Sequence, residues 1–336
     1  MRGNLAKAPL VAVLYASLLH FTTIFLPFTL YYREARYTFA WSLTWLDNLW
    51  LVAYALFVCL VAALAFAAIE QKGMAAFLRL MPIFLGLGWI MPMLQPFLLG
   101  TPAALTEWDI LMHFAGGVGA TILMLLLSTF LYSRKPVLAE GEEPPKKEKV
   151  KGGPRKFKLV RLTLFMLLAL PFAFFIFYFV GWYFLAWRED ALRAFYGGPA
   201  ETSGFFFMLI STLLERPMEA GLTLLRGFLL AAFSLLLLLN LSHKKLMFIV
   251  ISVLLFLSPA LFYLIPTALM PWEVRLPHLI FSAAHLLLFS VLCAFLLPLA
   301  LNKGVQTEEV EEEAAAPAEK GKKPVGTGKP IPAKAK

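Results

Sequence analysis

The sequence predicts an all-α integral membrane protein with about eight transmembrane helices. Hydrophobic residues make up 60% of the 336 residues and charged residues only 15%, whereas a soluble domain typically carries about 25% charged residues. The charged residues are gathered into short blocks, and long uncharged runs separate these blocks. Since a helix needs about 20 mostly apolar residues to cross the hydrocarbon core of a bilayer, the uncharged runs are the expected membrane spans.

Eight such runs follow one another along the chain. The first follows Arg2 and Lys7, and it is longer than the apolar part of a cleaved signal peptide, so we expect it to remain as a helix. The sixth is the weakest, because Arg226 must lie within the outer part of that span. The runs are Ala8–Tyr32, Asn48–Ile69, Leu80–Thr106, Ile110–Ser133, Leu162–Trp187, Gly227–Ser242, Leu246–Trp272 and Leu276–Asn302.

Basic residues mark every second link between the runs. They include Lys72 and Arg79 between the second and third runs, and Lys244 between the sixth and seventh. Because Lys and Arg are enriched in cytoplasmic loops, we expect a multi-pass protein of the cell membrane with both termini in the cytoplasm. The net charge of +9 belongs to this topology signal. No nucleic-acid-binding motif accompanies that charge, so we expect no nucleic-acid partner.

Two matched pairs of segments indicate an internal repeat. Residues 102–109 (PAALTEWD) align without a gap with residues 266–273 (PTALMPWE), and residues 32–34 (YRE) correspond to residues 187–189 (WRE). The alternative is chance similarity between apolar segments. Each half would begin and end in the cytoplasm, so two parallel four-helix repeats related by an axis along the membrane normal are expected. The predicted domains are 1–133 and 159–303 for the repeats, 134–158 for a basic cytoplasmic linker and 304–336 for a disordered cytoplasmic tail.

The segments outside the spans have two different compositions. The linker and the tail are rich in Lys, Glu, Pro and Gly, a composition that cannot bury an apolar core. The bilayer is the expected partner, and the basic residues of both segments could contact anionic lipid head groups. By contrast, Gly204–Leu214 is apolar but too short to span a membrane, so we expect an interfacial or partly inserted helix there.

Polar residues from both halves fall at the predicted outer ends of the helices. Charged side chains beside a membrane span usually face a water-accessible crevice or pair with one another. We therefore expect an outward-facing polar crevice at the seam between the repeats. The alternative is a set of helix-end ion pairs that bind no ligand. The residues predicted for substrate binding or coupling are Arg33, Asp47, Asp109, His113, Arg188, Arg216, Glu219, Glu273 and His278.

The sharpest local motif is Asp109-x-x-x-His113-Phe114. On a helix this spacing puts the carboxylate and the imidazole on one face, where the acid can orient the histidine. The alternative role of Asp109 is to stabilise the helix N-terminus. The motif resembles the Asp-x-x-x-His-Phe motif of VanZ-like small membrane proteins, a group linked to glycopeptide-antibiotic resistance. The resemblance covers about ten residues, carries over no biochemical activity, and is not matched by the spacing of Glu273 and His278.

No cofactor or metal is predicted. Two acids and two histidines from the repeats would suit zinc by ligand type, but the chain has neither His-Glu-x-x-His nor a paired-His motif. A Walker A loop, a dinucleotide-binding fingerprint and a nucleophile elbow are also missing from the sequence. An ATP-driven pump in one chain is therefore not expected.

The distribution of proline favours a transport function. Pro82, Pro92 and Pro96 interrupt the third span, and Pro259 and Pro266 the seventh. Kinked helices at matching positions of two halves are typical of transport sites, although neighbouring helices can also hold a static bend.

We therefore expect a carrier or flippase-like transporter of a polar or amphipathic solute, with an anionic solute as one candidate. In this scheme Arg33, Arg188 and Arg216 attract an anionic group. Four acids, Asp47, Asp109, Glu219 and Glu273, couple protons. One alternative is an envelope enzyme acting on a lipid-linked substrate at the outer face, with Asp109 and His113 as base and orienter. Another is a non-catalytic membrane scaffold or complex subunit.

Overall fold

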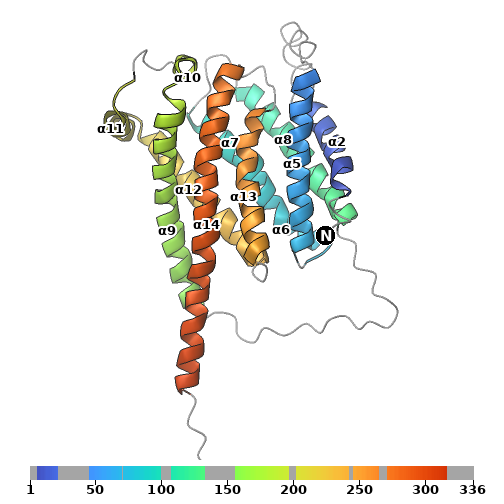
Figure 1. The fold of residues 1–336 in the computed structure, drawn as a ribbon, viewed down its shortest axis with the longest axis vertical. Helices are drawn as coiled ribbons and strands as arrows, with labels where there is room; N and C mark the ends of the chain where they lie inside the picture. Colours follow the sequence, from blue (N-terminus) through green and yellow to red (C-terminus); the bar gives the residue numbers. More distant parts are fainter. Residues whose placement is uncertain are drawn as a thin grey trace, which may run out of the picture.

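The protein is built from helices that pack side by side. The structure is a computed structural model that describes residues 6–21, 45–69, 71–99, 107–132, 156–196, 202–241, 245–264 and 271–315. Within these ranges all regular structure is helical (Figure 1). Seven of the described helices are long and apolar enough to cross a membrane. The prediction of an all-α membrane protein with several transmembrane helices is therefore confirmed.

The helices follow the expected spans closely. The first expected span begins at the predicted residue, and its remainder beyond Phe21 lies outside the described residues. The sixth span runs without interruption through Arg226. The elements are α2 (Ala8–Leu19), α5 (Trp45–Ala68), α6 (Met74–Leu85), η2 (Gly86–Ile90), α7 (Met91–Leu99), α8 (Glu107–Tyr132), α9 (Lys156–Gly181), η3 (Trp182–Ala186), α10 (Asp190–Phe195), α11 (Phe205–Glu215), α12 (Pro217–Leu241), α13 (Lys245–Leu261), η4 (Phe262–Leu264) and α14 (Trp272–Ala315).

The third span changes its winding at its centre. α6, η2 and α7 follow one another without a break, and η2 is a single π-helical turn. In this turn the Met91 amide donates to the carbonyl of Gly86, five residues earlier, and Pro92 follows without an amide proton of its own. Such turns occur mainly as single π-bulges and are frequent at functional sites. The proline-interrupted third span is thus an α–π–α helix.

Successive long helices run in opposite directions through the bundle. The first residues of α2 and the last residues of α14 lie toward the same end, which is the lower end in Figure 1. The starts of α5, α8 and α14 lie toward the opposite end, where α10 also lies (Figure 1). The two ends of the bundle are called the terminal end and the loop end below.

The helix contacts of the first half have counterparts in the second half, where α12 also contacts α13. In the first half, α2 contacts α5 and α8, and both α5 and α6 contact α8. In the second half, α9 contacts α12 and α14, and both α12 and α13 contact α14. Between the halves, α5 packs against α13, α12 packs against α6 and α7, and α13 packs against η2. The seam between the halves is therefore made by α5, α12, α13 and the broken third span.

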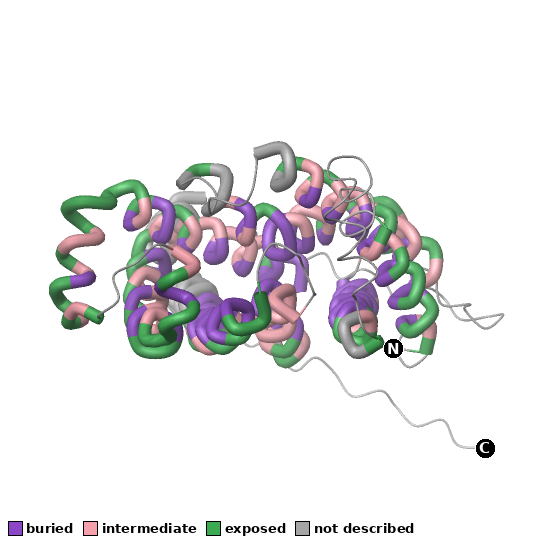
Figure 2. The backbone as a smooth tube through the Cα atoms, turned by 90° about the horizontal axis from the view of Figure 1, so that it is seen from above, coloured by how far each residue is buried: buried purple, intermediate pink, exposed green. Residues whose placement is uncertain are grey.

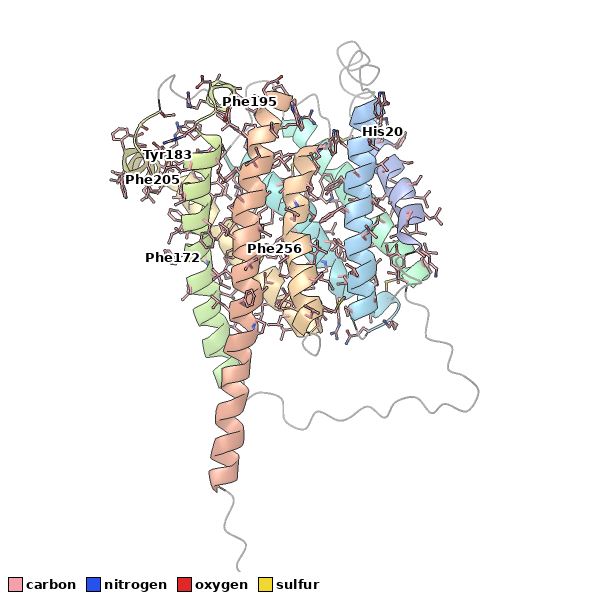
Figure 3. The ribbon with its side chains drawn as sticks, viewed as in Figure 1. His20, Phe172, Tyr183, Phe195, Phe205 and Phe256 are labelled. Atoms are coloured by element: carbon pink, nitrogen blue, oxygen red, sulfur yellow. The ribbon has the colours of Figure 1, made fainter. Side chains whose placement is uncertain are left out.

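The outer surface of the bundle is strongly apolar. Buried residues face the interior of the helix layers, while exposed residues face outward (Figure 2). Phe130 is 72% exposed, Leu168 64% and Phe172 60%, and Figure 3 shows Phe172 on the outer side of α9. In water such a surface would be unfavourable, whereas lipid tails can cover it. The helices thus carry an apolar face for the bilayer as well as an apolar core.

α11 lies across the long helices instead of beside them. It is viewed nearly end-on in Figure 1 and from the side in Figure 2. One face packs on η3, which continues α9, and there the rings of Phe205 and Tyr183 lie 5.3 Å apart (Figure 3). The other face exposes Phe206, Phe207 and Leu214 by 69–77%. α11 is thus a short apolar helix, and its interfacial or partly inserted position stays a prediction.

The long last helix differs from the sequence expectation. α14 continues through Ala315, so residues 304–315 are helical where a disordered tail was expected. Residues such as Glu312 and Ala314 favour the helical state, and they extend a helix that the bundle has already nucleated. Residues 316–336 lie outside the described residues. The expected linker 134–158 also lies outside them, apart from the first turn of α9 at Lys156.

The close packing of α9 and α12 leads to a stability prediction. A Cβ atom added to Gly227 would lie 2.8 Å from the Cα atom of Pro171. Because that atom belongs to the backbone, Gly227→Ala must push the two helices apart, and we expect a loss of about 1–3 kcal/mol. Gly221→Ala on the same helix is the matched control, since nothing lies within 4 Å of its added Cβ. In thermal unfolding in detergent, we expect a lowered midpoint for Gly227→Ala and an unchanged midpoint for Gly221→Ala. Equal midpoints for the two variants would contradict the close approach of α9 and α12.

Candidate functional site

The two predicted histidines meet the same short turn. His113 on α8 is 7% exposed and His278 on α14 is 5% exposed, and the 3₁₀ turn η4 lies against both. The Phe262 ring stands edge-on to His113 at 5.8 Å between ring centroids, and the next residue, Tyr263, stacks on His278 at 5.1 Å. Successive residues of a 3₁₀ helix point in directions about 120° apart. η4 can therefore contact a histidine from each half at once.

An aromatic cage surrounds His278. Tyr263 lies nearly parallel to the imidazole, and the ring of Trp182 lies 5.6 Å from it. The Tyr196 hydroxyl and His278 Nε2 share a hydrogen bond of 3.0 Å. Burial raises the pKa of Tyr196 above its usual value, and the neighbouring Tyr263 and Tyr178 hydroxyls add to the rise. Tyr196 therefore stays protonated at neutral pH, and its hydroxyl hydrogen-bonds the imidazole of His278.

The surroundings of His113 are also aromatic. Its ring lies 5.7 Å from that of Trp89 on η2 and close to Phe262, and Trp89 and Phe262 contact each other at 5.3 Å. Gly117, one turn further along α8, makes room for Trp89, because an added Cβ would lie 2.1 Å from the indole. The space left by the missing side chain of Gly117 is thus filled by Trp89.

A buried threonine anchors this side of the seam. Trp89 Nε1 donates to Thr121 Oγ1 at 2.7 Å, and the Tyr15 hydroxyl lies 3.0 Å from the same oxygen. All three side chains are at most 2% exposed. The Thr121 hydroxyl therefore links α2 and η2 to α8. It provides hydrogen bonds for the polar groups of Tyr15 and Trp89, which lipid tails could not do.

A second polar group lies deeper in the second half and is called the Arg226 cluster here. The guanidinium of Arg226 on α12 is within hydrogen-bonding reach of the Tyr178 hydroxyl. The positive charge of Arg226 also affects Tyr196, Tyr263 and His285 electrostatically. Tyr196 and Tyr263 are the two tyrosines that contact His278. The cluster draws on α9, α12, α14, η4 and the residue after α10, and its members are Tyr178, Tyr196, Arg226, Tyr263 and His285.

The proton position on His285 is fixed by the backbone. His285 Nδ1 lies 2.8 Å from the Phe281 carbonyl oxygen, which can only accept a hydrogen bond. Nδ1 must therefore carry the proton, and in the neutral ring Nε2 is an acceptor. The imidazole also stacks on the Phe281 ring at 4.3 Å. His285 is thus an ordered part of an aromatic stack.

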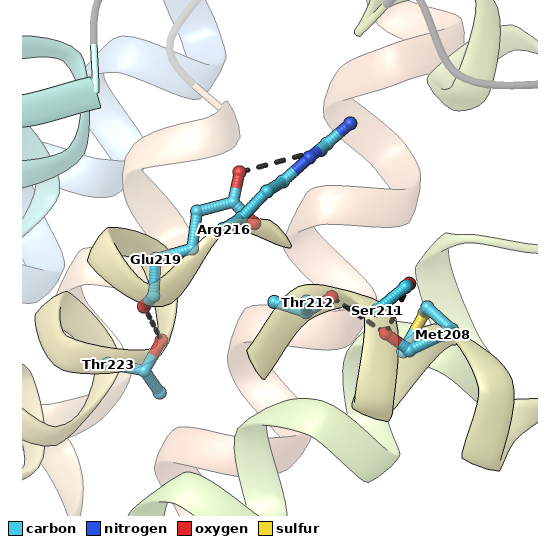
Figure 4. A network of polar contacts seen from close by, with 6 residues as sticks. All are labelled: Met208, Ser211, Thr212, Arg216, Glu219 and Thr223. Atoms are coloured by element: carbon cyan, nitrogen blue, oxygen red, sulfur yellow. Dashed lines mark hydrogen bonds and ion pairs between the residues drawn. The ribbon is translucent and has the colours of Figure 1, made fainter. Parts of the chain in front are cut away.

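The charged residues at the loop end make local contacts. Arg188 is exposed and lies over the rings of Tyr183 and Phe184 at 5.8 and 5.5 Å. Arg216 and Glu219 pair at 3.6 Å, and Thr223 donates to the Glu219 carbonyl oxygen (Figure 4). The paired side chains are 66% and 38% exposed, so solvent screens much of their attraction.

The remaining predicted residues do not meet in the described part of the protein. Glu273 is exposed in the first turn of α14, a position where a carboxylate favours the helix dipole. Asp47 and Asp109 lie in the first turns of α5 and α8, but the positions of their side chains are outside the description. Arg33 also lies outside the described residues. The structure thus brings His113 and His278 to one turn, while Glu273 is at the surface.

The sequence analysis missed most of the aromatic residues of the site. Tyr178 and Trp182 are four residues apart, and His278, Phe281 and His285 follow at steps of three and four. These spacings place each set along one face of a helix. A search for polar aromatic residues on one helix face would have found them, whereas the search for charges found only Arg226.

Metal ligation has no geometric support in the described ranges. Among these residues, no three or more His, Cys, Asp or Glu side chains are grouped as ligands for a metal ion. Comparison with known proteins adds no relative: no family model, curated protein or solved structure matches the chain.

The shared hydroxyl of Thr121 provides a test of this side of the site. Thr121→Val keeps the side-chain shape and removes the acceptor of the Trp89 indole, so we expect a loss of about 1–3 kcal/mol and a shift of the tryptophan fluorescence. Thr129→Val is the matched control, because Thr129 Oγ1 donates only to the Leu125 carbonyl of its own helix. Thermal unfolding of both variants in detergent measures the difference. A midpoint for Thr121→Val that equals that of the control would contradict the role of Thr121.

Proposed function

We propose that this protein is a carrier or flippase-like transporter of a polar or amphipathic solute, built from two parallel four-helix repeats. The observation that carries the proposal is the position of η4. Its residues Phe262 and Tyr263 contact His113 from the first half and His278 from the second. A turn that touches both halves at the seam is well placed to move when the halves tilt against each other.

Helix packing supports the repeat. If α2, α5, α6 and α8 correspond to α9, α12, α13 and α14, the contacts of the first half reappear in the second. The contacts between the halves are also paired, since α5 with α13 corresponds to α12 with α6. In addition, α8 begins at Glu107 just before Trp108, and α14 begins at the matched Trp272. These pairings are those of a two-fold axis along the bundle.

Interrupted helices at corresponding positions support movement. The third span contains the π-helical turn η2, and its counterpart α13 ends in the 3₁₀ turn η4 just beyond Pro259. η2 packs against α13, and Trp89 of η2 touches Phe262 of η4. Broken helices that face each other at a repeat interface are typical of solute sites in secondary transporters.

Basic side chains support a cytoplasmic location for the terminal end. Lys7 donates to the Leu131 carbonyl near the end of α8, and Lys72 donates to the Ile69 carbonyl just after α5. Arg79 donates to Asn240 Oδ1 and so joins α6 to the last turn of α12. The two lysines satisfy carbonyl groups at helix C-termini, and all three residues carry the charge excess that favours a cytoplasmic side. In this orientation Arg188 and Arg216 lie outside, where they can attract an anionic solute.

Reconstitution into phospholipid vesicles tests the transport proposal. We expect the purified protein to move a fluorescent phosphatidylglycerol between leaflets, or a radiolabelled carboxylate across the bilayer, faster than protein-free vesicles do. His278→Phe should slow this movement about tenfold, because it keeps the ring but removes the hydrogen bond to Tyr196 that orients the cage.

The control variant is Ser211→Ala, whose hydroxyl donates only to the Met208 carbonyl of α11 and should leave the rate unchanged. No movement of either probe would contradict a transporter. Consumption of a lipid-linked substrate that is lost in His113→Phe would instead identify an envelope enzyme. Co-purification of a stoichiometric partner, with neither activity, would identify a scaffold.

A further inference from the structure

The crossing helix α11 has an exposed apolar face, which is called the open face here. It consists of Phe206, Phe207, Ile210 and Leu214, whose side chains are 54–77% exposed. Their spacing along the chain places them on one side of a helix, while Met208 on the other side packs into an aromatic cluster with Tyr183. The 11 residues of α11 extend about 16 Å, which is too short to cross a bilayer.

The open face continues the apolar outer surface of α9. α11 lies beside the loop end of α9, on the outer side on which Phe172 also lies (Figure 3). From Phe172, exposed apolar side chains continue through Ile176 to Phe184 of η3. Phe184 stacks on Phe205, the first residue of α11, at 5.8 Å between ring centroids. Lipid tails that cover α9 can therefore cover the open face as well.

The polar groups of α11 do not require water. The hydroxyls of Ser211 and Thr212 both donate to the Met208 carbonyl oxygen, at 3.0 and 2.8 Å (Figure 4). Just before the helix, the Ser203 carbonyl oxygen accepts a hydrogen bond of 2.9 Å from the Tyr183 hydroxyl. The helix is thus attached to the span at its start, and its hydroxyls are satisfied within the helix, as burial among lipid tails demands.

A cation lies where the span ends beside α11. Arg188 follows Ala186, the last residue of the apolar span, by two residues, which is the level of the lipid head groups. Its guanidinium lies over the rings of Tyr183 and Phe184 at 5.8 and 5.5 Å, and both rings also contact Phe205. A guanidinium stacks through its face and donates hydrogen bonds in its plane. These ring contacts therefore leave its N–H groups available to an anion.

We propose that Arg188 binds the phosphate of a phospholipid in the leaflet at the loop end, and that the open face of α11 lies among the tails of this leaflet. The planar guanidinium matches two oxygens of a phosphodiester, and the exposed rings beside it receive the start of the acyl chains. The inference goes beyond transport, because it requires only a bilayer around the helices.

Spin labels on single cysteines measure the position of α11 in phospholipid vesicles. The intact chain with Cys59 and Cys293 replaced by alanine carries the label at Phe207→Cys, at Phe172→Cys as the reference in the lipid, or at Glu273→Cys as the reference in water. We expect the Phe207→Cys label to collide with oxygen more than with a water-soluble nickel chelate, as the Phe172→Cys label does. Oxygen partitions into lipid tails, whereas the chelate stays in water.

Two results of this measurement would overturn the position among the tails. Collisions like those of the Glu273→Cys label would place the open face in water. Poor access to both reagents would place another protein on the open face, and dipolar broadening between labels would identify that protein as a second copy of the chain.

Thermal unfolding of the intact chain in a nonionic detergent tests the phosphate contact. The probes are phosphatidylglycerol, phosphatidylcholine, diacylglycerol with the same tails, and inorganic phosphate. We expect both phospholipids to raise the unfolding midpoint more than diacylglycerol does, because diacylglycerol has no phosphate. Inorganic phosphate at the same concentration should leave the midpoint unchanged, because it has no tails. Equal effects of phospholipid and diacylglycerol, or saturation by inorganic phosphate, would overturn the proposal.

Variants assign the phosphate contact to Arg188. Arg188→Gln should weaken the apparent affinity for either phospholipid about fivefold or more, and Arg188→Lys less, because lysine keeps the charge but not the planar fork. Arg79→Gln is the matched control, since it removes the same charge at the terminal end, where Arg79 bonds Asn240. Unchanged affinity in Arg188→Gln, or an equal loss in Arg79→Gln, would contradict a phosphate site at Arg188.

This inference and the transport proposal fail separately. A phosphate-dependent midpoint that Arg188→Gln abolishes, without movement of any probe in vesicles, would retain the lipid site and contradict transport. Movement in vesicles with a Phe207→Cys label in water, and with equal effects of phospholipid and diacylglycerol, would retain transport and contradict the lipid site.

Discussion

Lipid tails cannot accept or donate hydrogen bonds, and the backbone polar groups within a span must therefore find their partners inside the protein, which also favours polar side chains that are partnered there. This constraint explains where the polar side chains of the chain lie. Thr121 serves both Trp89 and Tyr15 in the first half, and Tyr178 meets Arg226 in the second. Apolar residues cover the outside of the same helices. Because these buried polar groups lie where helices meet, the helix interfaces are the places where a solute site can form.

Among the described residues, aromatic contacts and the hydrogen bond from Arg79 to Asn240 join the halves at the seam. Phe262 touches Trp89, His113 and Tyr54, all of which belong to the first half. Tyr263, the next residue, belongs to the aromatic cage around His278 in the second half. Ring contacts of this kind depend on apolar burial and tolerate sliding better than a fixed hydrogen-bond geometry does. A seam built in this way can hold two bundles together and still allow them to tilt.

The sequence predicted the helices better than the site. Long uncharged runs and the Pro and Trp anchors located the spans, including the one through Arg226, because crossing the bilayer dictates length and composition. Which face of each helix turns inward was not predictable, since the lipid-facing Phe172 and the buried Phe174 are equally apolar. The convergence of Tyr178, Tyr263 and His285 depends on that orientation. The prediction of repeats remains open, and the matched helix contacts are its structural support.

The central claim is that two like-oriented four-helix bundles share one membrane and one seam. The most direct measurement is labelling of single cysteines by a membrane-impermeant maleimide, after replacing the buried Cys59 and Cys293 with alanine. Exposed positions at the two ends, Trp45, Glu273 and Lys72, provide the labelling sites. The account predicts that Trp45→Cys and Glu273→Cys react from outside intact cells, and Lys72→Cys only after permeabilisation. Reaction of Trp45→Cys and Glu273→Cys from opposite sides of the membrane would contradict it.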